Sequence, residues 1–80
     1  MRVRALLFAS LRERAGAGEI DLELPAGSSV DAARDALEAR HPGLFAGPVA
    51  TAVNGAHVRG AGARLREGDE IAFLPPVSGG

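Results

Sequence analysis

The chain has 80 residues, of which 46% are hydrophobic and none is cysteine, and its formal net charge is -1. This length predicts one small domain, and without cysteine neither disulfides nor a thiolate metal site can stabilise it. The small net charge argues against nucleic acid as a primary partner, because such a partner favours a basic surface. No apolar run approaches membrane-spanning length and the N-terminus lacks a signal-peptide pattern, so we expect a cytoplasmic protein with no membrane partner.

The first part of the chain predicts two paired strands. Residues 2–8 alternate at their start and then become wholly apolar, and residues 19–24 alternate cleanly between polar and apolar. If the two strands pair antiparallel, the arginines of the first share a face with the acids of the second, and these cross-strand charges favour that register. Between the strands, residues 10–14 predict a short helical turn.

One main helix is predicted next, over residues 29–40. Ser28 fits its N-cap, with Asp31 three residues later as the acidic half of a capping box. Apolar residues spaced three and four apart give the segment one apolar face. The His-Pro-Gly stretch at 41–43 should end the helix, because proline disfavours helical geometry in the residue before it.

Three strands are predicted after the helix. Residues 49–53 and 56–59 flank Asn54-Gly55, the sequence that a type I′ hairpin turn prefers. Residues 70–74 form the last strand, which ends at two prolines that cannot donate a ladder hydrogen bond.

The resulting order, β-β-α-β-β-β, predicts an α+β fold of the β-grasp (ubiquitin-like) type. In this arrangement one main helix covers one face of a mixed sheet of about five strands, and the first and last strands are parallel neighbours at its centre. The division expected is a β-grasp domain over residues 1–75 and a flexible C-terminal Gly-Gly tail over residues 76–80. The predicted core includes residues from all of these elements: Ile20, Leu22, Val30, Leu37, Ile71 and Phe73.

The body of the domain offers little catalytic chemistry. His41 precedes the helix-ending proline, where a cation can interact with the exposed carbonyls, and nothing near His57 in the sequence completes a nucleophile–base pair. Two distant histidines without cysteine give no metal-ligand spacing, so no metal is expected. The glycine-rich stretches lack the lysine and the following helix of a phosphate-binding loop.

One surface does suggest docking. The alternation of the first and last strands turns Phe8 and Leu74 away from the core, which predicts an exposed apolar patch where the chain leaves the last strand. A contiguous apolar patch is more often an interface than an ordinary surface, although a loop folded over it would also explain these residues.

The sequence resembles a known family over nearly its whole length. The resemblance rests on Leu-Phe-Ala at 7–9, Leu-Arg-Glu at 11–13, Ala-Val-Asn-Gly at 52–55, Gly-Asp-Glu-Ile-Ala-Phe at 68–73 and, most specifically, Pro-Pro-Val-Ser-Gly-Gly at 75–80. These stretches resemble the small subunit of molybdopterin synthase, a ubiquitin-like sulfur carrier of molybdenum-cofactor biosynthesis.

This resemblance implies a function for the end of the chain. An ATP-dependent, ubiquitin-activating-like adenylyltransferase would adenylate Gly80, and a sulfur-donating enzyme would convert the adenylate into a thiocarboxylate. The large synthase subunit, in a heterotetramer of two small and two large subunits, would then use that sulfur to form the dithiolene on cyclic pyranopterin monophosphate. No permanently bound cofactor is implied, because the activating partner uses the ATP, and the chain alone would not be a catalyst.

The remaining tail residues would be threaded into the partner: Pro75, Pro76, Val77, Ser78 and Gly79. Glycines without a Cβ suit a narrow channel, and prolines with a fixed φ reduce the entropy lost on threading. Phe8, Leu74, His57 and Arg12 are the candidate partner-interface residues, although a surface arginine is often merely solvated. A disordered terminus or an added linker is the alternative explanation of the tail.

Other functions remain open at this point. A carrier for cysteine, thiamin or transfer-RNA thiolation would share the tail chemistry, although thiamin carriers are typically shorter and lack the Pro-Pro-Val stretch. A protein modifier that forms isopeptide bonds is also possible. All nine basic residues of this chain are arginine, so lysine-linked chains of the protein on itself are excluded.

Overall fold

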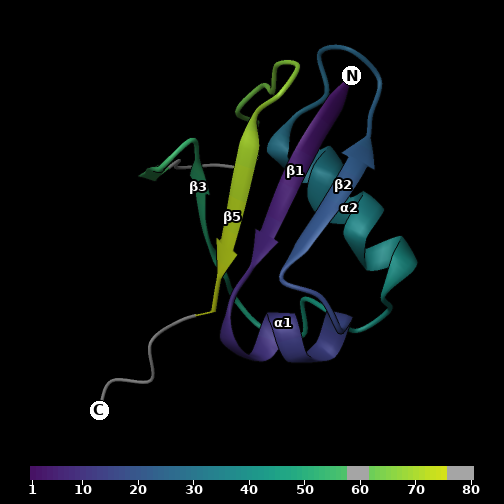
Figure 1. Ribbon diagram of the computed structural model, residues 1–80, viewed down its shortest axis with the longest axis vertical. Coiled ribbons are helices and arrows are strands. Elements are labelled where there is room, and N and C mark those ends of the chain that lie inside the picture. Colours follow the sequence, from purple (N-terminus) through teal and green to yellow (C-terminus); the bar gives the residue numbers. More distant parts are fainter. Residues whose placement is uncertain (58–61, 76–80) are drawn as a thin grey trace.

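The protein is a two-layer domain in which a five-stranded sheet packs against one helix while a second helix lies across the end of the sheet (Figure 1). The computed structural model describes residues 1–57 and 62–75. The elements are β1 (Arg2–Leu7), α1 (Ala9–Ala15), β2 (Glu19–Glu23), α2 (Val30–Arg40), β3 (Ala50–Val53), β4 (Ala56–His57) and β5 (Glu70–Leu74). This mixed sheet with its main helix confirms the predicted α+β, β-grasp fold.

The first and last strands are parallel neighbours inside the sheet, whose strand order is β2-β1-β5-β3-β4. Ala5 pairs with Ile71 and Leu7 with Phe73, and these four side chains are buried. All other pairings are antiparallel. Strands that are covered on one face and flanked on both edges favour the strongly apolar composition of β1 and β5.

The predicted charge pairing between β1 and β2 is present. Arg2 lies opposite Glu23 and Arg4 opposite Asp21, with Nε–carboxylate distances of 3.1 and 3.4 Å. Both pairs are solvent-exposed, so each contributes at most about 1 kcal/mol to stability. They do favour this register, because a one-residue slip of β2 would separate the charges and turn the apolar side chains of β2 toward water.

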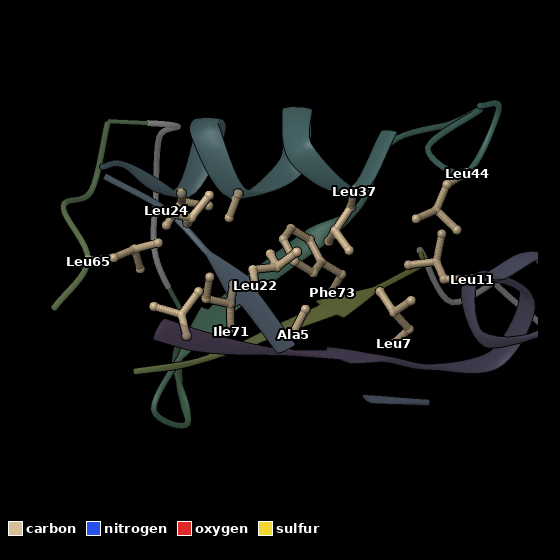
Figure 2. Packing of buried hydrophobic residues seen from close by; sticks show 13 residues of the cluster. Ala5, Leu7, Leu11, Leu22, Leu24, Leu37, Leu44, Leu65, Ile71 and Phe73 are labelled. Atoms are coloured by element: carbon tan, nitrogen blue, oxygen red, sulfur yellow. The ribbon is translucent and has the colours of Figure 1, made fainter. Parts of the chain in front are cut away.

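The core lies between the sheet and α2 (Figure 2). Five of the six predicted core residues are buried, whereas Ile20 is half-buried and packs against the edge of the cluster. Its strand, β2, lies at the edge of the sheet, so no neighbouring strand covers its outer side. Leu11 from α1 and Leu44, which follows α2, close one end of the core, and Leu65 closes the other.

The start of α2 differs from the predicted cap by one residue. Ser29, not Ser28, is the N-cap, and its Oγ accepts a hydrogen bond from Ala32 N at 3.3 Å. Ser28 Oγ instead donates to the carbonyl of Pro25 at 2.7 Å. The predicted capping box is therefore wrong, because the third helical residue is Ala32 and Asp31 lies in the first turn without that role.

Helix α1 is longer than predicted. The expected turn over residues 10–14 is a helix from Ala9 to Ala15, capped by Gly16 in the left-handed conformation at φ 75°. A segment this short would form little helix on its own, because helix nucleation is unfavourable. Burial of Leu11 against the core supplies the stabilisation that local propensity lacks.

The hairpin between β3 and β4 is confirmed. Asn54 and Gly55 have φ values of 50° and 84°, as a type I′ turn requires. Strand β3 begins at Ala50, one residue later than predicted, and the predicted continuation of β4 beyond His57 lies outside the described residues.

Asn54 also joins this hairpin to the turn that precedes β5. Its Nδ2 donates to Asp69 Oδ1 at 2.9 Å, and its Oδ1 accepts from Glu70 N at 3.0 Å. Asp69 Oδ2 accepts a third bond, from Arg66 N at 2.8 Å. Hydrogen bonding from the Asn54 side chain and then from the Arg66 backbone lowers the pKa of the Asp69 carboxyl below its ordinary value.

We therefore expect Asp69→Asn to destabilise the protein in a pH-dependent manner. A carboxylate whose folded-state pKa is depressed stabilises the fold above its unfolded-state pKa of about 3.9, and this contribution is lost as the pH falls through the lower folded-state value. At pH 7 the loss should be about 0.5–1 kcal/mol, equivalent to a few degrees in Tm. Thermal unfolding at a series of pH values measures this effect.

Asp35→Asn, on the exposed face of α2, is the matched control and should change Tm little at any pH. A Tm deficit of Asp69→Asn that does not shrink as the pH falls below the unfolded-state pKa of about 3.9 would contradict the assignment.

Candidate functional site

The chain leaves the sheet from an interior strand. β5 lies between β1 and β3, and Phe73, fully buried, pairs with Leu7 on one side and Thr51 on the other. Pro75, half-buried, follows directly. The position of Pro75 is therefore fixed by two neighbouring strands, whereas the predicted tail residues Pro76, Val77, Ser78, Gly79 and Gly80 lie outside the described residues.

The face of the sheet away from α2 has a charged end and an apolar end. The charged end carries Arg2, Arg4, Asp21, Glu23 and Glu70. Toward the end of β5 the same face becomes apolar, because the outward-pointing residues there are leucine, phenylalanine and alanine. The apolar end lies beside α1, where β1 and β5 both terminate (Figure 1).

The apolar end forms a contiguous patch around the exit of β5. We call the outward-facing residues Leu6, Phe8, Ala72 and Leu74 the apolar patch. Leu6 pairs with Ala72, and the same register continued by two residues brings Phe8 to Leu74. Phe8 is the one large hydrophobic side chain that is exposed among the described residues, at 43%. The alternative expectation, that a loop folds over the patch, is not met by the described loops, since Phe8 remains open to solvent.

A sharp turn after Phe8 keeps its ring on the outer face. Phe8 has extended backbone angles, φ -119° and ψ 155°, and the next residue, Ala9, has a φ of 49°. An alanine in this left-handed region costs roughly 1–2 kcal/mol. The turn allows the chain to leave the strand direction at once and to start α1 across the sheet end.

Arg12 borders the apolar patch. A cavity of about 570 Å³ is lined by Leu6, Phe8, Arg12, Gly18 and Glu19, among others. A Cβ on Gly18 would lie 3.4 Å from Arg12 Nε, so the arginine side chain crosses directly over this glycine. The arrangement places one cation next to an exposed aromatic ring, where it is available to a partner.

His57 extends the same face on the far side of β5. It pairs with Ala52, which in turn pairs with Ala72 of the patch, so all three side chains share one face. Two strand spacings, about 10 Å, separate His57 from Ala72. The structure therefore brings Phe8, Leu74 and Arg12 together around the exit of β5 and leaves exposed His57 at the margin.

A second cavity adjoins Pro75 on the other side of α1, and sequence reasoning did not anticipate it. It measures about 310 Å³ and is lined by Ser10, Leu11, Arg14, Pro48 and Pro75, among others. The lining comes from three segments distant in sequence, so no local pattern could have indicated it.

Within residues 1–57 and 62–75, no group of three or more histidine, cysteine, aspartate or glutamate side chains is placed to hold a metal ion. Neither helix in the described part of the chain has the length and apolarity needed to cross a membrane.

Comparison with known proteins identifies the family. The model of the ThiS family matches residues 5–80. The chain belongs to the ThiS family. Its relatives include the molybdopterin synthase sulfur carrier subunits of Chlamydomonas reinhardtii, 36% identical over all of both chains, and of Arabidopsis thaliana, 33% identical over all of this chain and 84% of the relative. The resemblance to the small subunit of molybdopterin synthase is thus confirmed.

Solved structures of similar proteins agree with this fold. SAMP1 (small archaeal modifier protein 1) of Haloferax volcanii superposes on this ThiS-family chain with a TM-score of 0.87 and 32% identity, over the whole of both chains. A complex of subunits 1 and 2 of the molybdopterin-converting factor of Helicobacter pylori contains a chain that matches with a TM-score of 0.73 and 27% identity, also over both whole chains.

We expect the apolar patch to be dispensable for folding of this ThiS-family protein. Phe8→Asp should lower the free energy of unfolding by less than about 1 kcal/mol, because Phe8 is 43% exposed and is not part of the core cluster. Phe73→Ala, in the core, should cost about 3–5 kcal/mol. Urea denaturation compares the two, and a loss for Phe8→Asp as large as that for Phe73→Ala would show that the ring belongs to the core.

Proposed function

We propose that this protein is the sulfur-carrier subunit of molybdopterin synthase. The observation that carries the proposal is the full-length similarity to two proteins of that name, and it is supported by the exposed apolar patch around the exit of β5. In this function the folded body holds and presents the C-terminal segment, and the carboxyl group of Gly80 is the reacting group.

The proposed chemistry has two steps at the Gly80 carboxyl group. First, a carboxylate oxygen attacks the α-phosphorus of ATP on an activating adenylyltransferase, forming an acyl-adenylate and releasing pyrophosphate. Second, a sulfur donor attacks the acyl carbon and AMP leaves, so that one carboxyl oxygen is replaced by sulfur. Adenylation is needed because a free carboxylate is a poor electrophile, and the resulting thiocarboxylate is a good sulfur nucleophile at neutral pH.

The proposed acceptor is cyclic pyranopterin monophosphate bound to the large synthase subunit. The complex of subunits 1 and 2 in the Helicobacter pylori neighbour supports a large-subunit partner, and we propose a heterotetramer of two small and two large subunits. Delivery of the tail requires the partner to contact the domain around Pro75. The apolar patch lies there, and burying its residues would stabilise a complex by roughly 25 cal/mol per Å² of apolar surface before the costs of association.

A second candidate function follows from the structural neighbours. SAMP1 is named a modifier, which supports the possibility that the Gly80 carboxyl group is joined to amines of other proteins. Carriers for cysteine, thiamin or transfer-RNA thiolation would use the same activated tail. The acceptor separates these functions: a dithiolene product indicates molybdopterin synthesis, whereas isopeptide-linked proteins indicate modification.

Phe8→Asp and Leu74→Asp should each weaken binding to the large subunit at least tenfold. A carboxylate buried without a partner in an apolar interface loses its hydration, which costs several kcal/mol. Isothermal titration calorimetry of the purified subunits measures the affinity. Asp31→Asn on α2 is the control, and an unchanged affinity for both patch variants would remove the apolar patch from the interface.

Deleting Gly80 should abolish sulfur loading. A one-residue shift moves the reacting carbon by about 3.3–3.6 Å, and reacting groups tolerate much less displacement than this. Incubation with the adenylyltransferase, ATP and a sulfide source, followed by intact mass measurement, should detect the thiocarboxylate on the wild-type chain only.

An added residue after Gly80 should have the same effect, while Tm stays nearly unchanged in both variants. Normal dithiolene synthesis by the variant that lacks Gly80 would refute the sulfur-carrier function.

A further inference from the structure

Two cavities lie side by side along α1 and share one arginine. The cavity beside Pro75 is lined by Arg14, and so is a second one of about 390 Å³, which also includes Arg40, His41 and Leu44. Arg14 lines both cavities, so they adjoin at this side chain, between the exit of β5 and the end of α2. We call this surface the basic groove.

The charge of the basic groove is of one sign. Its lining includes Arg14 and Arg40, and no aspartate or glutamate is among the described residues that line either cavity. The chain as a whole carries a net charge of -1, so this local excess of positive charge is not a property of the entire surface.

The two arginines keep most of their hydrogen-bonding capacity. Arg14 Nη1 donates to the carbonyl of Leu44 at 3.2 Å, and Arg40 Nη1 donates to the carbonyl of Asp21 at 3.4 Å. Neither is within salt-bridge distance of a carboxylate among the described residues. A guanidinium has five N–H donors, so each of these can bind a further acceptor, and a carboxylate matches its geometry.

The acid nearest in sequence to the loop after α2 is already engaged. Glu38 accepts hydrogen bonds from Gly43 N at 3.2 Å and Phe45 N at 3.3 Å, so its carboxylate holds that loop in place. Glu13 precedes Arg14 on α1, but consecutive helical residues point about 100° apart. The positive charge of the groove is therefore not neutralised by these neighbours.

We propose that the basic groove binds a carboxylate-bearing segment of the large subunit, as a second contact surface beside the apolar patch. This inference rests on the proposed function, because it takes the large subunit as the protein that receives the tail. Pro75 and Arg14 line the same cavity, so a protein that surrounds the exit of β5 comes close to Arg14. The apolar patch and the basic groove then flank the exit from two sides of α1.

The two surfaces should act on different rate constants. Complementary charges outside the apolar centre of an interface mainly raise the association rate and define orientation, whereas apolar contacts mainly slow dissociation. The attraction is screened by salt, with a Debye length near 10 Å at 0.1 M ionic strength.

The test measures association of the purified, unmodified chain with the large subunit by stopped-flow or surface plasmon resonance, between about 20 mM and about 300 mM salt. Arg14→Gln combined with Arg40→Gln should lower the association rate about 5–10-fold at low salt, and the difference should shrink at high salt. Arg14→Lys, which keeps the charge, should retain most of the rate, and Arg14→Glu should lower it further.

Arg66→Gln is the control for a cation lost outside the basic groove. Arg66 lies next to the turn in which Gly68 N donates to the carbonyl of Arg2, at the opposite end of β1 from Pro75. An association rate of the double variant equal to that of Arg66→Gln at every salt concentration would overturn the proposal. A lowered Tm with an unchanged association rate would also overturn it, because it would show that Arg14 and Arg40 only hold Leu44 and the edge of β2.

Failure of this inference can be told apart from failure of the proposed function. If the wild-type chain binds the large subunit but the arginine variants associate normally, the basic groove alone is excluded. If the wild-type chain does not bind the large subunit at all, the proposed function itself is refuted and this inference with it.

Discussion

The parallel pairing of β1 with β5 is the constraint on which the rest of the structure depends. It joins the two ends of the described chain in the middle of the sheet, with Ala5 beside Ile71 and Leu7 beside Phe73. Two strands that run in the same direction cannot be joined by a tight turn, so everything between them must serve as a long crossover. The crossover consists of α1, β2, α2, β3 and β4, and α2 covers the face of the sheet that this pairing leaves apolar.

This pairing also determines where the chain leaves the sheet. β1 and β5 end side by side, so Pro75 emerges next to the turn from β1 into α1. A chain end anchored by two neighbouring strands starts from a defined position, which reduces the conformational freedom a partner must restrict on binding. The exposed ring of Phe8, the cation of Arg12 and the groove around Arg14 are found around this one point because α1 begins there.

The two faces of the sheet differ in burial. Along β5, Ile71 and Phe73 are fully buried against α2, while the alternating residues Ala72 and Leu74 point to the opposite face. Substitutions on the buried face therefore test stability, and substitutions on the opposite face test the proposed contact with the large subunit. Phe45 packs on the buried face, where its ring centroid lies 5.1 Å from that of Phe73. The Arg34 guanidinium carbon lies 5.1 Å from the Phe45 ring centroid.

The sequence by itself determined the strands, the hairpin and the family. Alternation identified β1, β2 and β5, because side chains on a strand point to opposite faces and one face is buried. Asn54-Gly55 predicted its turn because few residues accept two consecutive positive φ values. The apolar patch could be predicted as well, since Phe8 and Leu74 follow from the same alternation once the two strands are neighbours.

Tertiary structure alone decided the features that depend on contacts between distant segments. Helix α1 forms over two turns because Leu11 is buried against residues far away in the chain. The backbone on either side of the Ser29 cap is likewise held by a distant segment, since Leu65 N donates to the carbonyl of Ser28 and Val30 N to that of Ala63. The basic groove brings together Arg14, Pro48 and Pro75, which no periodicity relates. Local patterns report which face of an element is apolar, whereas a cavity shared by several elements depends on how those faces pack, and that information is present only in the folded chain.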